Sequence, residues 1–538
     1  MANLSKIRRE KMLEYLEKLK IMNHDDEHIR AITEIENALN QKKYGLVWEE
    51  HSEKVDEMLE HNIPVFVEQA ERKIVADTNE GYNFLLEGDN LHSLKILEKT
   101  HKGKIDIIYI DPPYNTKNKE FIYDDRMVGE DDGYRHSKWI SFMQKRLEIA
   151  LALLSKTGAI FISIDDNEQA ELKMLCDSIF MESNYITSFI RKTKSMTGDD
   201  GNGLNIQHEY MLVYARDKSL LKFKGEPKNF DNYSNPDNDP NGIWCAADPS
   251  AKSGGETTYF AIKNPYTGRQ DFPPKGRFWA FSKDTMEKYI ESGRIKFKEK
   301  YPENQRGFIF KRYAETMEIK TMPVDSLAFT ANEFMNSVAT SELKNVLSRG
   351  DFNYPKPTTF IKQLVKYAAH KEATILDFFA GSGTTGHAVI QLNQEDGGNR
   401  KYILCTNNEN HICEEITYQR LKNIQAEFPH NLKYYKTDFI PKFSEGEKSI
   451  SEKMMEHIKE LIELEYAIEL DHKKYIILDD EDKSDEIISE IENNGKLFIC
   501  SGIFLSRRDQ RILEEKGVSM IEIPEYYFRD ELREVGEG

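Results

Sequence analysis

Short apolar runs alternate with stretches of helical spacing in two separate parts of the chain. In the first part, the β-branched runs 105–110 and 159–165 lie on either side of 139–154, which has apolar residues at helical spacing. In the second part, the runs 374–380 and 402–406 are separated by a glycine-rich turn and a helical stretch. Short, almost wholly apolar runs are typical of parallel strands that are covered on both faces. The pattern predicts an α/β fold with a doubly wound, mostly parallel, Rossmann-like sheet.

The other parts of the chain do not follow this alternation. Residues 1–43 have helical spacing in a strongly charged background, which predicts two amphipathic helices that pack either on the chain's own core or on a second subunit. A basic run and a glycine-rich run at 191–203 predict a surface loop. Residues 217–324 crowd Asn, Asp, Pro, Gly and aromatic residues together, which indicates an inserted module. Beyond residue 441, a charged helix at 450–470 and three apolar runs predict a small α/β domain that either docks a partner or stabilises the fold.

The composition is that of a globular protein with more than one domain. The chain has 538 residues, of which 39% are hydrophobic and 31% charged. No apolar run approaches the length that crosses a bilayer, and the first ten residues lack the apolar core of a secretion signal, so we expect a cytoplasmic protein without a membrane segment. The five cysteines show no close pair at metal-ligand spacing, so we expect them to be reduced, and we expect no metal site.

Charge is distributed unevenly along the chain. The net charge of −19 taken alone argues against a nucleic-acid partner. Residues 441–538 hold 14 Lys and Arg against 26 Asp and Glu, whereas residues 251–320 hold 15 basic and 9 acidic residues. In that basic block cations alternate with aromatic residues, a pattern typical of a nucleic-acid surface but also of a small β domain with a solvated basic face. The alternating residues are Tyr259, Phe260, Lys263, Tyr266, Arg269, Phe272, Lys275, Arg277, Phe278, Trp279, Lys296, Phe297, Lys298, Phe308, Phe310, Lys311 and Arg312.

The run 105–110 ends at Asp111-Pro112-Pro113-Tyr114, which carries the first candidate chemistry. The two prolines cannot continue a sheet ladder, so a carboxylate, a fixed carbonyl and an aromatic ring share the rim of the sheet. A carboxylate and a carbonyl can accept both hydrogens of an exocyclic amine while the ring of Tyr114 stacks on a base. An ordinary proline turn, with Asp111 as a helix cap and Tyr114 in the core, would give the same four residues.

The second candidate is the glycine-rich turn Gly381-Ser382-Gly383-Thr384-Thr385-Gly386, which follows the run 374–380. Glycines let the backbone approach a ligand at the head of a helix, and Glu409 after the next strand suits ribose hydroxyls. Earlier in the chain, Asp89 either caps a helix or reaches the rim to bond a nucleotide-like ligand. The glycines alone would also suit a dinucleotide dehydrogenase, but no hydride-transfer constellation accompanies them.

Together, Asp-Pro-Pro-Tyr followed much later by Asp-Phe-Phe-Ala-Gly-Ser-Gly-Thr-Thr, with an insert between them, resembles the amino-methylating DNA methyltransferases of the permuted beta class. In these enzymes the catalytic half precedes the cofactor half. Three stretches are similar to the modification subunit of type III restriction-modification systems: Gly-Leu-Val-Trp-Glu-Glu at 45–50, Glu-Gly-Asp-Asn-Leu at 87–91 and Pro-Lys-Gly-Arg-Phe-Trp at 274–279. The resemblance covers roughly residues 40–440. One departure is Phe378, which stands where proline is common and should alter strand-end packing more than chemistry.

The resemblance implies a role for each motif residue. Asp111 and the carbonyl of Pro112 bind the amino group of a flipped adenine, Pro113 shapes the turn and Tyr114 stacks on the base. The remaining residues hold S-adenosylmethionine: Asp377, Phe379, Gly381 and Gly383 line its pocket, Glu409 holds its ribose, Asp89 approaches its adenine end, and Lys356 and Pro357 of Asn-Tyr-Pro-Lys-Pro approach its methionine end. The methyl group is transferred directly to the amine, with no metal and no covalent intermediate.

The implied protein is an adenine-N6 DNA methyltransferase that is also the recognition subunit of a type III system. Its expected partners are double-stranded DNA, a second copy of the chain and a helicase-nuclease restriction subunit. Asp before Pro-Pro and Tyr after it favour adenine over cytosine-N4 or RNA methylation, and the intact Asp111, Gly381 and Gly383 argue against the third alternative, a binding-only specificity subunit. The implied domains are an N-terminal helical docking or dimerisation segment (1–50), a catalytic half (51–216), a target-recognition insert (217–330), a cofactor half (331–440) and a C-terminal α/β interaction domain (441–538).

Overall fold

The computed structural model describes residues 4–22, 26–40, 48–77, 80–116, 122–123, 126–127, 135–195, 203–315, 321–348, 352, 354–442, 449–524, 527 and 529–534. Residues 45–47, Asn353 and most of the glycine-rich run near 200 lie outside this part of the chain. Two compact units are found: the first combines Met1–Lys222 with Asp325–Gly538, and the second is Phe223–Val324. The second unit falls within the region predicted as an insert.

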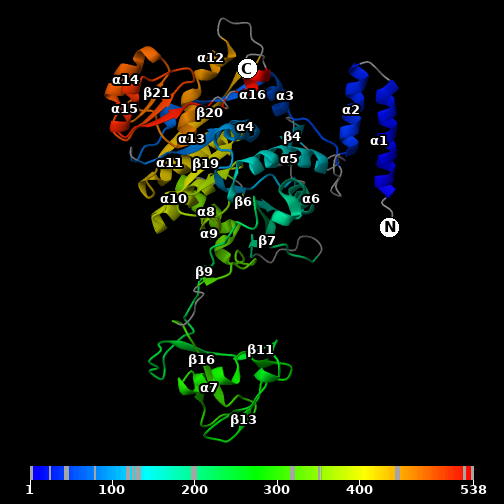
Figure 1. The fold of residues 1–538 in the computed structure, drawn as a ribbon, viewed down its shortest axis with the longest axis vertical. Coiled ribbons are helices and arrows are strands. Elements are labelled where there is room, and N and C mark those ends of the chain that lie inside the picture. The colour runs from blue at the N-terminus through cyan, green and yellow to red at the C-terminus, as the bar shows by residue number, and fades with distance from the viewer. Residues whose placement is uncertain are drawn as a thin grey trace. The chain divides into compact units, whose positions relative to one another are not determined.

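The first unit is built on a nine-stranded sheet of described residues (Figure 1). Its strands are β1 (Asn62–Glu68), β2 (Asn83–Glu87), β3 (Ile105–Ile110), β6 (Leu154–Ile164), β7 (Tyr185–Lys192), β8 (His208–Ala215), β18 (Thr374–Asp377), β19 (Lys401–Thr406) and β20 (Leu432–Pro441). They lie in the order β1-β20-β2-β19-β18-β3-β6-β8-β7. The pairings from β20 to β6 are parallel, and β1, β8 and β7 pair antiparallel at the two sides. The predicted α/β class with a mostly parallel sheet is confirmed.

Helices cover both faces of the sheet, as a doubly wound fold requires. Alternate strand residues such as Ile108 and Leu376 share one core with Leu94 and Leu147, which lie on helices of the first face. Tyr109 points to the opposite face, where its ring packs edge-on against the ring of Phe360 on α9. The helices are α3 (Lys54–His61), α4 (Asn90–Thr100), α5 (Arg135–Leu153), α6 (Gln169–Cys176), α8 (Asn336–Leu347), α9 (Thr358–Ala368), α10 (Thr384–Asp396) and α11 (Tyr418–Asn423).

Both ends of the chain add elements beyond the sheet. The two predicted N-terminal helices are α1 (Leu4–Met22) and α2 (Asp26–Asn40). The single helix predicted over 450–470 is wrong, because two helices, α12 (Ile450–Met455) and α13 (Ile458–Tyr466), replace it, and α13 joins the main core. The three predicted strands form a parallel sheet. It comprises β21 (Tyr475–Leu478), β22 (Lys496–Ile499) and β23 (Ser519–Glu522), with α14 (Ser484–Glu490), α15 (Arg507–Glu515) and α16 (Arg529–Glu534).

The second unit is a small β module with one described helix. Its core contains Trp279 and Phe308, so these two members of the alternating basic and aromatic set pack inward. Lys311 is buried as well, where its ammonium bonds Asp237 and Asp239. The elements are β9 (Glu226–Pro227), β10 (Trp244–Ala247), β11 (Ser250–Ala251), β12 (Ile262–Lys263), β13 (Gln270–Asp271), β14 (Phe278–Trp279), α7 (Lys283–Glu291), β15 (Ile295–Phe297), β16 (Phe308–Tyr313) and β17 (Thr321–Met322).

Two whole-chain expectations concern the cysteines and the membrane. None of the five cysteines, all of which lie in the described part of the chain, is in a disulfide. Among the described residues, no helix combines the length and the apolar character that crossing a bilayer requires.

Candidate active site

One cavity of about 850 Å³ brings the two sequence motifs together. Asp111 to Tyr114 follow β3, and the residues from Asp377 to Ser382 follow β18. These strands are parallel neighbours, with Ile107 paired with Ile375, so both motifs leave the same edge of the sheet. The carboxyl ends of parallel strands are where open α/β sheets form ligand sites. The fold therefore closes the long gap in sequence between the motifs.

The carboxylate of Asp111 is held by two donors at the rim of this cavity. The hydroxyl of Tyr114 donates to Oδ1 of Asp111 at 2.7 Å, and Nζ of Lys356 donates to the same oxygen at 2.8 Å. Lys356 also donates to the hydroxyl of Tyr114 at 3.0 Å. Trp139 fixes the turn by donating from Nε1 to the carbonyl of Pro113 at 2.7 Å. The structure thus places Lys356, which the resemblance assigned to the cofactor, against the amine-holding motif.

Behind Tyr114 lies a buried ion pair that sequence analysis did not assign to the site. Glu209 on β8 accepts from Nε of Arg191 at 2.7 Å, and its carboxylate lies 3.3 Å from the hydroxyl oxygen of Tyr114. Its carboxylate is also 3.6 Å from the ammonium of Lys356. Arg191 was predicted in a surface loop, but it is the next-to-last residue of β7 and is fully buried. The sequence around Glu209 is typical of a strand, and nothing in it indicates an ion pair with Arg191.

The charges around Tyr114 set its ionisation state. Burial acts to raise the pKa of Glu209, but the charges of Arg191 and Lys356 outweigh it and lower that pKa, so Glu209 is an anion. Burial and the charges of Asp111 and Glu209 raise the pKa of Tyr114 well above its usual value. Tyr114 therefore keeps its hydroxyl proton and can donate it to Asp111.

The glycine-rich turn is organised by Asp377 at the end of β18. Oδ1 of Asp377 accepts the backbone N–H of Phe379 at 3.0 Å, and its other oxygen accepts the hydroxyl of Thr385. Burial raises the pKa of Asp377 to about 7. Gly381 and Gly383 have φ values of 48° and 74°, which side chains disfavour, and Gly383 immediately precedes α10. The turn therefore needs glycine at both positions.

A buried arginine supports this turn from the protein interior and was missed by sequence analysis. Nη1 of Arg420, on α11, donates to Oγ of Ser382 at 3.1 Å and to Oγ1 of Thr384 at 2.9 Å. Burial lowers the pKa of Arg420 to about 10, so it is still a cation at neutral pH. Beside it, Oγ1 of Thr417 donates to the carbonyl of Gly381 at 2.6 Å. Arg420 on α11 and Thr417 directly before it thus hold the shape of the turn.

The structure does not bring every predicted site residue to the cavity wall. Asp111, Pro112, Pro113, Tyr114, Lys356, Asp377, Phe379 and Gly381 line it. Gly383 and Pro357 lie one residue from lining residues, at the starts of α10 and α9. Glu409 begins an exposed 3-10 turn, and it is Asn410 and Glu415 nearby that reach the wall. Asp89 caps α4 by accepting the N–H of Leu91 at 2.8 Å.

Comparison with known proteins decides the family. The sequence profile of a DNA methylase family matches residues 105–419, which is more than half of the chain and includes both motifs. The chain belongs to the DNA methylase family. The StyLTI Mod subunit, a type III restriction-modification enzyme of Salmonella typhimurium, is 33% identical over 400 residues, covering 68% of this chain and 59% of that protein. M.KpnI, a type II methyltransferase of Klebsiella pneumoniae, is 34% identical over 390 residues, covering 66% of this chain and 90% of that protein.

The chain thus spans about three fifths of the StyLTI Mod subunit. Among solved structures, the M1.HpyAVI-SAM complex is 12% identical and covers 64% of this chain and 98% of that chain, with a TM-score of 0.28. A score of this size carries no structural argument.

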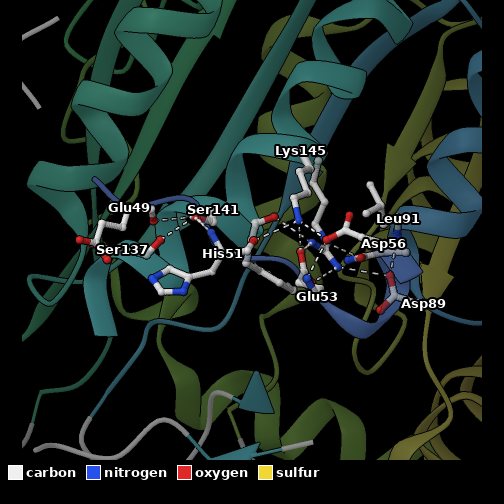
Figure 2. A network of polar contacts seen from close by, with 12 residues as sticks. Glu49, His51, Glu53, Asp56, Asp89, Leu91, Ser137, Ser141 and Lys145 are labelled. Carbon is white, nitrogen blue, oxygen red and sulfur yellow. Dashed lines mark hydrogen bonds and ion pairs between the residues drawn. The ribbon is translucent and has the colours of Figure 1, made fainter. Parts of the chain in front are cut away.

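In this family member, a third buried arginine bonds Glu53 and Asp89, which Figure 2 shows beside Asp56 and Lys145. Arg146 on α5 donates to both carboxylate oxygens of Glu53, at 3.0 and 3.1 Å, and to Oδ1 of Asn90 at 2.6 Å. Nδ2 of Asn90 in turn donates to the carbonyl of Phe378 at 2.7 Å. Arg146 also donates to Asp89 at 3.2 Å. The Asp89 region therefore supports the end of β18 through Asn90.

The residue after the Asp-Pro-Pro-Tyr motif is anchored by another buried acid. Nδ2 of Asn115 donates to Oε1 of Glu168 at 2.5 Å, and Nδ1 of His136 lies 2.7 Å from the same oxygen. Asn115 has a φ of 54°, and its side chain is almost fully buried. Burial raises the pKa of Glu168 to about 8. These contacts fix the backbone directly after Tyr114.

The raised pKa of Glu168 predicts how stability depends on pH. Between its usual value of 4.5 and about 8, the folded protein keeps a proton on this carboxyl that the unfolded chain releases. This contribution to stability is complete below the unfolded pKa and is lost as pH rises through the folded pKa. We expect the thermal midpoint of the wild type to fall more steeply from about pH 5 to about pH 9 than that of Glu168→Gln. Parallel midpoint curves from scanning calorimetry of the two proteins would contradict this.

Proposed function

We propose that the chain is a site-specific DNA methyltransferase that transfers a methyl group from S-adenosylmethionine to N6 of an adenine flipped out of double-stranded DNA. The observation that carries the proposal is the single cavity lined by both Asp111–Tyr114 and the glycine-rich turn. Membership of the DNA methylase family and the similarity to Mod subunits support it.

The residues around the turn fit an adenosine-containing cofactor. Gly381 leaves backbone exposed to the cavity, where a side chain would crowd Phe352 at 3.3 Å. Phe379 offers an aromatic face, and Asn410 and Glu415, which come after β19, supply polar groups at the cavity wall. We assign ribose recognition to this stretch, with Glu409 at its start, and assign the methionine end to the side of Lys356 and Pro357. When bound, S-adenosylmethionine supplies an electrophilic methyl group.

The chain's own residues prepare the amine for attack. The carboxylate of Asp111 and the carbonyl of Pro112 accept its two hydrogens, which draws the nitrogen lone pair out of conjugation with the ring. Pro113 holds the turn, and the ring of Tyr114 stacks on the flipped base. In the structure the ammonium of Lys356 donates to Asp111. When the amine takes this place on Asp111, the nearby carboxylate of Glu209 is a second acceptor for the ammonium of Lys356. Asp111 is also the nearest base for the proton that the amine loses.

The wider role follows from the Mod relatives. We propose that the chain is the modification and recognition subunit of a type III restriction-modification system and works in the cytoplasm beside a helicase-nuclease restriction subunit. The insert at 217–330 reads the target between the catalytic half (51–216) and the cofactor half (331–440). The N-terminal segment (1–50) supports a homodimer, and the C-terminal domain (441–538) docks partners. A type II methyltransferase is the second candidate, because the chain covers 90% of M.KpnI but only 59% of the StyLTI Mod subunit.

A transfer assay with the purified chain tests the proposal. Duplex DNA is incubated with methyl-labelled S-adenosylmethionine, and the nucleosides released by digestion are separated. We expect label in N6-methyladenine. Label in N4-methylcytosine would show that cytosine is the acceptor base. Label only in an RNA substrate of the same sequence would show that RNA is the acceptor. Binding of S-adenosylmethionine by calorimetry without any transfer would favour the binding-only alternative.

A further inference from the structure

A hairpin in the second unit presents exposed aromatic and basic side chains, among which Arg269 lies over the ring of Tyr301 at 5.4 Å. β12 and β13 pair from Ile262 to Asp271, and the loop between them carries Tyr266. We define the hairpin surface as Tyr259, Lys263, Tyr266, Arg269, Phe272 and Lys275, all of which are exposed. Tyr266 is 64% exposed, and Tyr259 and Phe272 are each 49% exposed with ring centroids 5.9 Å apart. Large aromatic side chains left outside the core in this way mark an interaction surface.

The hairpin is rigid because its inner face is fixed to the unit. Asn264, which is fully buried, donates through Nδ2 to the carbonyls of Lys298 and Gly307 at 2.9 and 2.8 Å. Its Oδ1 accepts the backbone N–H of Tyr266 at 2.9 Å, so the tip is tied to the same anchor. Asp271 accepts the N–H of Gly307 at 2.9 Å. The backbone that carries the aromatic tip is therefore held by the unit, which lowers the entropy that binding must overcome.

The cations of this surface differ from several other basic residues of the unit, which are paired with acids. Lys311 and Lys296 bond Asp237, and Arg306 bonds Asp248, so their charges are neutralised within the fold. Across the described residues, none of Lys263, Arg269 and Lys275 takes part in an ion pair. The second unit holds 17 Lys and Arg against 14 Asp and Glu in a chain whose net charge is −19. An uncompensated positive patch in an acidic protein indicates a polyanionic partner.

We propose that the hairpin surface is the face on which the second unit contacts duplex DNA, which deepens the function proposed above and rests on it. A two-stranded ribbon fits the major groove. Lys263 pairs across the strands with Gln270, and both side chains point outward, so a cation and an amide that can read base edges lie side by side. Arg269 and Lys275 contact phosphates, and Tyr266 enters the groove at the tip.

Charge-removing variants test the proposal. Lys263→Gln/Lys275→Gln is compared with Lys283→Gln/Lys288→Gln, which removes two exposed lysines from α7 of the same unit. Binding to a duplex that carries the methylated sequence is measured by fluorescence anisotropy at several salt concentrations. We expect the hairpin pair to weaken binding about tenfold and to reduce the salt slope by about 1, since Lys275 is the member of the pair that contacts a phosphate and each lost phosphate contact removes about one. The α7 pair should change binding less than about twofold.

A third variant, Tyr266→Ala, tests sequence recognition separately from the attraction between charges. We expect it to lower the preference for the methylated sequence over unrelated duplex while the salt slope stays as in the wild type. Equal binding by the hairpin and α7 pairs, or tighter binding to duplex RNA than to DNA, would overturn the proposal. Unfolding midpoints show that each variant is folded. Transfer of methyl groups by the wild type is recorded in parallel, so failure of the methyltransferase proposal is seen separately from failure of the hairpin proposal.

Discussion

Replacing Asp111 with alanine is expected to slow methyl transfer about 10²- to 10³-fold, which is the usual cost of removing one group that stabilises developing charge in a buried site. Asp111 lies at the rim of the cavity and carries the oxygen to which both Tyr114 and Lys356 donate. Without it the amine keeps only the carbonyl of Pro112 as an acceptor. Single-turnover rates with methyl-labelled S-adenosylmethionine measure the loss.

The same variant should bind its ligands normally. The contacts that shape the glycine-rich turn come from Asp377, Thr417 and Arg420, none of which bonds Asp111. We therefore expect the affinity for S-adenosylmethionine and for DNA to change less than about threefold. Asp111→Asn keeps one acceptor oxygen and should fall between the alanine variant and the wild type. A wild-type rate in Asp111→Ala would remove Asp111 from the mechanism.

Replacing Arg146 with methionine is expected to lower the free energy of unfolding by about 3 kcal/mol, because it leaves the buried carboxylate of Glu53 with only the partly exposed Lys145, 3.6 Å away. The side chain of Arg146 is 1% exposed, and that of Glu53 is 8% exposed. The variant should also weaken binding of S-adenosylmethionine, since Asn90 joins Arg146 to the carbonyl of Phe378. Urea unfolding and calorimetry measure the two effects.

Two further variants test whether the loss of stability comes from leaving the carboxylate of Glu53 without Arg146, and whether removing a partly exposed cation has the same effect. Arg146→Met/Glu53→Leu removes both members of the pair and should recover part of the lost stability, because no isolated charge remains. Lys145→Gln, which removes the neighbouring and partly exposed cation that bonds Asp56 and lies 3.6 Å from Glu53, should cost less than about 1 kcal/mol. Equal stabilities for Arg146→Met and Lys145→Gln would show that the buried network contributes little.

Local chemistry made the fold class and the two motifs predictable. The strands β3, β6, β18 and β19 are short apolar runs, and prolines or glycines end two of them at the rim. β20 gave no such signal, because it contains Lys433, whose fully buried ammonium bonds Glu463 and Glu68. A charge inside a strand hides its pattern when the neutralising partner lies far away in sequence.

The same reason explains which site residues were missed. Arg191, Glu209 and Arg420 are buried charges whose partners come from other elements, so no spacing in the sequence indicates them. Lys356 was placed from its motif alone, whereas its contacts with Asp111 depend on how α9 meets β3. In the insert, alternating cations and aromatics could not distinguish the buried ring of Trp279 from the exposed ring of Tyr266, because only packing separates them.

Sequencing that detects modified bases, applied to DNA from cells that express this chain alone, tests the central claim most directly. The proposed function predicts N6-methyladenine at one short asymmetric sequence, on one strand only, and its disappearance when the cells express Asp111→Ala. N6-methyladenine on both strands of a palindrome would keep the enzyme but favour the type II candidate. DNA without a new modification from cells that hold the folded chain would contradict the claim that this chain is by itself a DNA methyltransferase.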